Sequence, residues 1–212
     1  MFNKKSVITA IVTSIASLLV AATASAINGP YIGGALGYGN IYQSQVLANE
    51  DGVTGGKGGL AGRIFGGYEF TQFLAAEMGY TKFSNNSVTA YVNTPAFGKL
   101  TGPQTIKSYA VDLVAKATLP LQDGFNLFGK LGAAYLNEQT TSNTVVSNSA
   151  GDVLGLGKNT YDRILPTFGL GLGYDLSKNV STDVSWMRIQ KTSSSTMQST
   201  DTVMLGLSYH FN

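Results

Sequence analysis

The chain has 212 residues, of which 12% are charged, and it contains 26 glycines and no cysteine. The length suits one domain, and the low charge is unlike that of a disordered segment or an ordinary soluble surface. The absence of cysteine excludes a disulfide framework and any thiolate metal site.

The N-terminal residues 1–26 have the pattern of a secretory signal peptide. Lys4 and Lys5 form a positive start, residues 7–22 carry no charge, and small residues occupy 24–26. We expect cleavage after Ala26, which leaves 27–212 as the mature domain. The alternative is a membrane anchor, but the uncharged run is short for a span and rich in Ala, Ser and Thr.

Without Lys4 and Lys5, the mature chain has equal numbers of basic and acidic residues. The full chain has 14 basic and 12 acidic residues, so loss of the two lysines leaves a formal charge of zero. A basic surface for nucleic acid is therefore not predicted.

Eight segments of the remaining chain alternate between apolar and small or polar residues, which predicts strands. In chain order they are 30–42, 58–70, 73–84, 106–119, 125–138, 162–176, 180–190 and 202–211. The last shows the pattern best, because every second residue from Val203 to Phe211 is apolar. In the sixth segment, from Phe168 onward, glycines fill the opposite face. An apolar face opposite a small, weakly charged one suits a wall between lipid and a narrow interior.

The connections between these segments alternate in length. Residues 71–72, 120–124 and 177–179 form short turns, and Asp123-Gly124 is a turn signature. The long connections are polar and comprise 43–57, 85–105, 139–161 and 191–201. Short turns at one end and long loops at the other are typical of a bacterial outer-membrane barrel, and an even strand count puts both termini on the periplasmic side.

These patterns predict an all-β fold, an eight-stranded antiparallel up-and-down transmembrane β-barrel. After the signal no apolar run is long enough for a transmembrane helix, and only helices and closed barrels satisfy every backbone group in lipid. The alternative is a soluble antiparallel sandwich. Aromatic residues near strand ends are expected at the membrane interface, and these are Tyr38, Tyr68, Tyr80, Tyr109, Tyr135, Tyr174, Trp186, Tyr209 and Phe211.

The same register places a set of charged residues in the interior. They are Arg63, Glu69, Glu77, Asp112, Lys116, Lys130, Asp175 and Asp183. Charges in a narrow lumen are costly unless they are paired or hydrated, so we expect Glu77 to pair with Lys116 or Lys130. Such a network is either a gate for small ions or a structural plug, and eight strands leave little room for a passage.

Short motifs along the chain resemble those of the transmembrane domain of the OmpA-like family. They are Phe-Gly-Gly-Tyr at 65–68, Ala-Glu-Met-Gly-Tyr at 76–80, Ala-Lys-Ala at 115–117, Lys-Leu-Gly at 130–132 and Ser-Tyr-His-Phe at 208–211. The resemblance implies an eight-stranded barrel plugged by a charged network with at most a small gated passage. It places Glu77, Lys116 and Lys130 where the family keeps inward charges. Gly173 and Asp183 depart from that pattern, so the family's gating pairs do not transfer intact. The peptidoglycan-binding domain of many members is not implied for this chain.

The sequence predicts no catalytic, cofactor-binding or metal site. Its single histidine, His210, faces inward near the periplasmic rim without an evident Ser/Asp partner set. The Gly-Gly-Lys-Gly-Gly run at 55–59 lacks the spacing and the following Ser or Thr of a phosphate loop.

We therefore expect a structural outer-membrane barrel that supports the envelope of a Gram-negative cell, with weak pore activity at most. The alternative is an adhesin acting through its long loops, with an unknown extracellular ligand, and a third hypothesis is a lipid-modifying barrel enzyme. The expected partners are outer-membrane lipid and the barrel-assembly machinery, which would bind the terminal strand 202–211.

Overall fold

The computed structural model describes residues 29–41, 54–55, 58–94, 98–143, 156–192 and 199–211. The expected signal peptide, 1–26, lies outside the described residues. No helix among those described has the length and apolar character needed to cross a bilayer.

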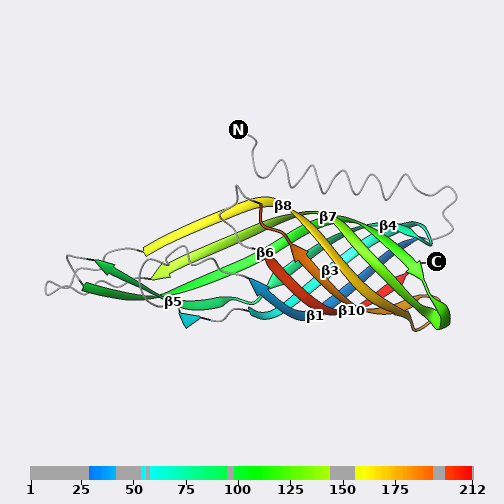
Figure 1. Ribbon diagram of the computed structural model, residues 1–212, viewed down its shortest axis with the longest axis horizontal. Coiled ribbons are helices and arrows are strands. Elements are labelled where there is room, and N and C mark those ends of the chain that lie inside the picture. The colour runs from blue at the N-terminus through cyan, green and yellow to red at the C-terminus, as the bar shows by residue number, and fades with distance from the viewer. Residues whose placement is uncertain are drawn as a thin grey trace.

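Eight long strands form a closed antiparallel barrel (Figure 1). They are β1 (Pro30–Ile41), β3 (Gly58–Thr71), β4 (Leu74–Phe83), β6 (Gly98–Pro120), β7 (Phe125–Asn143), β8 (Leu156–Asp175), β9 (Val180–Ile189) and β10 (Thr200–His210). Each pairs with the next along the chain, and β10 closes the ring on β1, where Leu205 lies opposite Leu36. The expected fold class is therefore confirmed, and the sandwich alternative is wrong.

One end of the barrel carries the short connections, and we call it the turn end; the other is the loop end. At the turn end a 3-10 turn, Gln122–Gly124, joins β6 to β7. Asp123 and Gly124 have positive φ values of 57° and 79°, as a tight turn with this signature requires. Both ends of the described barrel also meet there, since the Phe211 N–H donates to the Pro30 carbonyl over 3.0 Å.

Strand structure extends further at the loop end than the sequence indicated. The connection expected at 85–105 contains β5 (Asn86–Thr94) paired with the first part of β6, and the 43–57 connection contains β2 (Thr54–Gly55). Strands β7 and β8 likewise continue through part of 139–161. The sequence analysis assigned these segments to loops because they are rich in polar residues, but their Thr and Val residues favour extended backbone.

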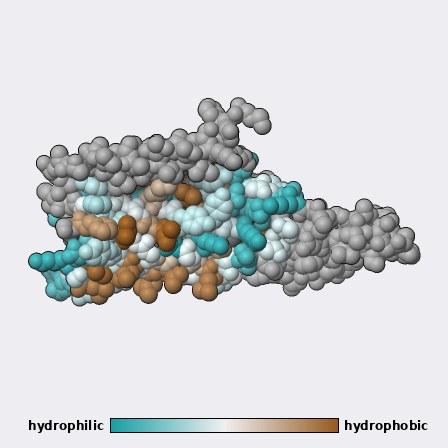
Figure 2. All heavy atoms as spheres, turned by 180° about the vertical axis from the view of Figure 1, so that it is seen from behind, coloured by the Kyte–Doolittle hydropathy of each residue, from teal (hydrophilic) through white to brown (hydrophobic). Residues whose placement is uncertain are grey.

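The outer wall of the barrel is apolar. Leu36, Leu60 and Leu131 are 74%, 77% and 68% exposed, although they alternate with buried residues on the same strands. Figure 2 shows hydrophobic residues, in brown, gathered along the wall, with hydrophilic residues, in teal, toward the ends. A continuous apolar exterior on a closed barrel is the surface that lipid covers.

The interior differs from the expected lining of glycine and a few ions. Its loop-end half holds a cluster of buried apolar side chains, which we call the apolar tier. The large members are Phe83, Leu136, Leu165, Ile189 and Met204, all between 0% and 8% exposed. Strand alternation places these residues inward, but it does not show that they meet at one depth, because each strand contributes only one or two of them.

Inward glycines make room for large side chains of neighbouring strands. A Cβ at Gly79 would overlap the Arg63 guanidinium, and a Cβ at Gly67 would lie 2.5 Å from the ring of Tyr31. These close approaches explain why glycine accompanies the charged and aromatic residues of the lumen.

Candidate functional site in the barrel interior

Five charged residues from four adjacent strands meet in the middle of the barrel, and we call them the charged tier. They are Arg63 on β3, Glu77 on β4, Asp112 and Lys116 on β6, and Lys130 on β7. The strand register brings them together. Lys116 lies opposite Lys130, and Asp112 lies opposite Gly79, which is two residues from Glu77 on β4. All five occupy inward positions of their strands, and the residues that alternate with the inward ones on each strand face the lipid.

Arg63 binds two carboxylates at once. Its Nη2 donates to Glu77 Oε1 over 3.0 Å and to Asp112 Oδ1 over 2.8 Å, and its Nη1 donates to Asp112 Oδ2. Nη1 also donates to the Thr81 hydroxyl over 3.3 Å. Arg63 is 5% exposed and Asp112 is 3% exposed. The two-pronged pairing matches the guanidinium fork to a carboxylate and fixes both side chains.

Glu77 is the most enclosed acid of the tier, at 1% exposure. Its Oε1 accepts from Lys130 Nζ over 2.6 Å as well as from Arg63, and its Oε2 accepts from the Tyr31 hydroxyl over 2.9 Å. A buried carboxylate with this many charged and neutral donors is compensated for the loss of water.

Lys116 completes the tier without a direct ion pair among the described residues. Its Nζ lies over two rings, 5.4 Å from the centroid of Tyr31 and 4.8 Å from that of Phe128. Lys130 Nζ lies 5.3 Å from the Phe65 and Phe128 centroids. The tier thus holds three cations and two anions, and aromatic faces take up part of the excess positive charge.

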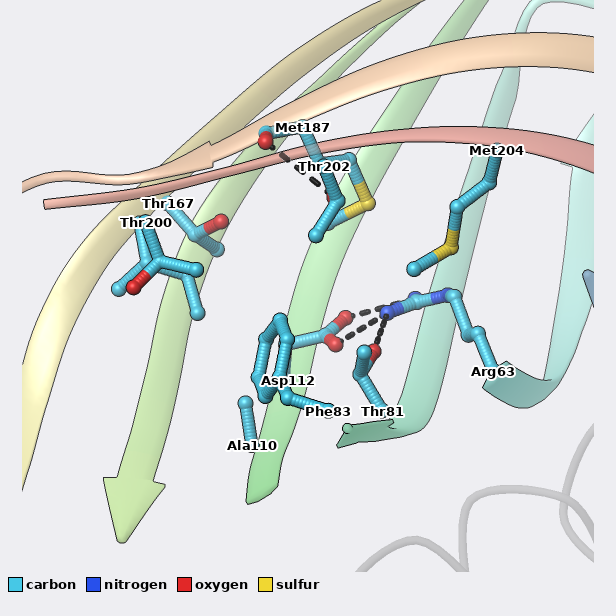
Figure 3. A pocket seen from close by; sticks show the side chains of 11 residues that line it. Arg63, Thr81, Phe83, Ala110, Asp112, Thr167, Met187, Thr200, Thr202 and Met204 are labelled. Carbon is cyan, nitrogen blue, oxygen red and sulfur yellow. Dashed lines mark hydrogen bonds and ion pairs between the residues drawn. The ribbon is translucent and has the colours of Figure 1, made fainter. Parts of the chain in front are cut away.

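A small cavity separates the charged tier from the apolar tier (Figure 3). Its volume is about 10 Å³, which is near the space that one water molecule needs. Arg63, Asp112 and Thr81 form one side, with threonines and methionines of β8, β9 and β10 on the other. Arg63 Nε and Thr200 Oγ1 are buried here without a hydrogen-bond partner among the described residues.

A second polar cluster, which the sequence did not indicate, occupies the turn end of the lumen. His210 Nε2 lies 3.0 Å from Ser181 Oγ, and His210 Nδ1 lies 3.3 Å from Glu69 Oε2. The imidazole stacks on Tyr31 with 5.3 Å between ring centroids. The order Ser–His–Glu is that of a nucleophilic triad, but Ser181 sits in the middle of a sheet, paired with Ser208 on one side and Asp175 on the other. The backbone N–H groups of such a strand are engaged in the ladder, so this arrangement lacks the free pair of donors that an oxyanion hole needs.

Two remaining acids of the expected lumen set lie apart from the charged tier. Asp183 is half-buried with its carboxylate against Gly206. Asp175 is exposed at the turn-end rim, because β8 ends at this residue and the wall no longer encloses it. Glu69, as described above, belongs to the turn-end cluster.

The aromatic residues expected at the interface lie on the outer wall in contacting pairs. At the turn end the ring centroids of Tyr68 and Phe70 are 5.4 Å apart, and those of Tyr209 and Phe211 are 5.0 Å apart. At the other end of the apolar band Tyr80 and Tyr109 are 5.8 Å apart. The rest of the expected set also lies at outward positions, namely Tyr38, Tyr135, Tyr174 and Trp186.

The strand alternation placed Phe128 in the lumen, but sequence reasoning missed Tyr31. Tyr31, 1% exposed, donates to Glu77, and Phe128, 3% exposed, lies beneath both lysines. The signal was available for Tyr31, since its position has the same parity as the inward Gly33 and Ala35. No group of His, Cys, Asp and Glu among the described residues has the arrangement of a metal site.

Comparison with known proteins identifies the barrel. A family model described as the OmpA-like transmembrane domain matches residues 25–212. An uncharacterized protein of Coxiella burnetii is 28% identical over 212 residues, covering 86% of this chain and 85% of that protein. Outer membrane protein A of Escherichia coli O157:H7 is 25% identical, covering 98% of this chain and 55% of that protein, so the chain spans about half of that relative.

Among solved structures, the outer membrane protein OprG of Pseudomonas aeruginosa superimposes with a TM-score of 0.54 at 14% identity, covering 89% of this chain and 98% of that one. This likeness concerns the fold alone. With the family match over nearly the whole barrel, the chain belongs to the OmpA-like transmembrane domain family and is an outer-membrane β-barrel.

Proposed function

We propose that this chain is a structural element of the outer membrane whose lumen is sealed. In this arrangement the loop end faces the outside of the cell and both ends of the mature chain lie in the periplasm. The barrel then contributes to the envelope as a rigid, lipid-covered cylinder, and its polar extensions project beyond the bilayer.

The observation that carries this proposal is the apolar tier across the lumen. Its five large side chains come from β4, β7, β8, β9 and β10, so they meet from most of the circumference. A constriction lined by apolar groups that excludes water opposes the passage of ions, which would have to shed their hydration. The adjoining cavity of about 10 Å³ is too small for a hydrated ion.

The apolar tier bears on whether the charged tier acts as a gate for ions or as a structural plug. If the ion pairs formed the barrier, loss of Glu77 would open a path. If the apolar tier forms it, the path stays closed whatever the charges do. We therefore assign the ion pairs a structural role, which is the plug alternative, and the seal to the apolar residues.

Planar-bilayer conductance of purified, folded protein tests this assignment. We expect wild type and Glu77→Ala to be equally silent, and the double variant Leu136→Ser/Leu165→Ser to conduct because hydroxyls let water enter the tier. Leu131→Ser, on the lipid face, is the matched control and should remain silent. Conductance in Glu77→Ala but not in the double serine variant would make the charged tier a gate.

The orientation is testable because the chain contains no cysteine. Lys158→Cys on the exposed part of β8 should react with a membrane-impermeant maleimide on intact cells, and Gln122→Cys in the short turn should react only after the envelope is broken. The reverse labelling pattern would place the loop end in the periplasm.

The adhesin alternative draws no support from the relatives, whose similarity establishes the barrel alone. Loop-deletion variants in a cell-adhesion assay would test it separately.

A further inference from the structure

At the loop end of the apolar band, the outer faces of β4 and β6 carry two lysines. The outward faces of β4 and β6 are apolar near the turn end. Toward the loop end each face then carries one tyrosine followed by one lysine. On β4 these are Tyr80 and Lys82, and on β6 they are Tyr109 and Lys107. Both lysines are exposed.

The register places these four residues in one patch, which we call the Lys-Tyr patch. Lys82 lies directly opposite Tyr109, and Lys107 is two residues further along β6 on the same face. Diagonal neighbours of this kind are about 7–8 Å apart, within reach of flexible lysine side chains. The rings of Tyr80 and Tyr109 contact each other, with 5.8 Å between their centroids.

The lysines of this patch have no acidic partner in register on the outer face. The neighbouring outward residues are Gly62 on β3, opposite Lys82, and Gln139 and Asn137 on β7, opposite Lys107 and Tyr109. None of these carries a charge, so the described surface leaves both ammonium groups uncompensated.

Elsewhere on the same rim some of the described charges have protein partners, whereas the exposed Lys158 and Arg163 on β8 form no ion pair among the described residues. Arg188 Nη1 lies 3.7 Å from Asp201 Oδ2, between β9 and β10. On the β7–β8 side, Asp162 Oδ2 accepts from the Tyr135 hydroxyl over 3.2 Å. The β4–β6 sector is distinguished by two unpaired lysines that the register brings together beside two outward tyrosines.

We propose that the Lys-Tyr patch binds the phosphorylated headgroup of a lipid in the outer leaflet. The lysine stems lie along the apolar wall and bring their ammonium groups to the level of the headgroups. There they attract phosphate oxygens, while the tyrosine rings occupy the boundary between acyl chains and headgroup. Two cations within reach of each other suit a phosphorylated glycolipid, whose sugars also contact aromatic rings. This inference depends on the proposed orientation, and it is independent of the sealed lumen.

Native mass spectrometry of the folded barrel in detergent tests the patch, with purified bis-phosphorylated lipid A, its dephosphorylated form and phosphatidylglycerol as separate probes. We expect wild type to retain the phosphorylated glycolipid, and Lys82→Gln/Lys107→Gln to bind it roughly 10- to 30-fold more weakly. Lys178→Gln, exposed in the turn between β8 and β9, is the control and should bind as wild type does.

Heat-modifiable gel migration confirms that each variant is folded before its affinity is compared. Equal affinity of wild type and the double variant would overturn the proposal, as would equal retention of the dephosphorylated lipid. Preferential binding of phosphatidylglycerol would overturn the outer-leaflet assignment. Full displacement by millimolar inorganic phosphate would show an anion site with no lipid preference and would also overturn it. Since both lysines lie outside the lumen, failure here leaves the conductance result unaffected.

Discussion

Glu77 and Lys130 are 53 residues apart in the chain, yet Oε1 of one lies 2.6 Å from Nζ of the other. The contact crosses from β4 to β7 over the intervening β6, so it exists only because the sheet closes into a narrow barrel. The same carboxylate also accepts from Arg63 and Tyr31, so one buried acid joins four strands.

Removal of this acid should destabilise the barrel strongly. Glu77→Ala leaves Lys130 buried without its counter-charge, and the loss of one partner of a buried pair costs about 3–5 kcal/mol. Urea unfolding in lipid vesicles, followed through the single tryptophan, Trp186, measures the change. Arg188→Ala breaks a partly exposed pair and should cost at most about 1 kcal/mol. Similar losses for the two variants would show that burial does not govern the Glu77 pair.

Tyr31→Phe isolates the neutral hydrogen bond to Glu77. The ring and its stacking remain, and only the hydroxyl that donates over 2.9 Å is lost. A buried acceptor that loses a donor costs about 1–3 kcal/mol. Tyr135→Phe removes a part-buried hydroxyl at the outer wall and should cost less in the same unfolding assay. A neutral Tyr31→Phe would mean that the two cations alone satisfy Glu77.

Leu136 and Leu131 offer a direct comparison of the two faces of β7. Leu136 is 0% exposed in the apolar tier, and Leu131 is 68% exposed on the lipid side. Leu136→Ala should cost about 2–5 kcal/mol because it leaves a cavity among rigid neighbours. Leu131→Ala should cost clearly less, since lipid chains fill the space. The ratio of the two unfolding free energies is the measurement, and equal values would argue against a packed interior.

Gly79→Ala tests whether glycine is needed for the charged tier. The added Cβ would overlap the Arg63 guanidinium, which must then move away from Asp112. We expect a loss of about 1–3 kcal/mol from this overpacking. Gly66→Ala is the control, because a Cβ there would meet its nearest atom, the Tyr31 carbonyl oxygen, at an ordinary 3.5 Å. Destabilisation by both changes alike would point to general strand effects rather than to Arg63.

The sequence alone determined the wall of this protein. A strict period of two assigns each residue of a strand to lipid or to lumen without knowledge of its neighbours, which is why Leu205 and Leu207 could be placed outward from the terminal segment. The turn at Asp123-Gly124 was equally local, because it depends on backbone preferences of two adjacent residues.

Only the tertiary structure decided what the interior contains at each depth. Depth depends on the stagger between strands, and alternation carries no information about stagger. The pattern therefore could not predict that Leu136 and Leu165 meet in the apolar tier. Nor could it predict the contact between Glu69 and His210, which lie on the two strands that flank β1. The loop-end extension at β5 was assigned to a loop because of its polar composition, and its pairing with β6 is set by strand neighbours that the sequence does not identify.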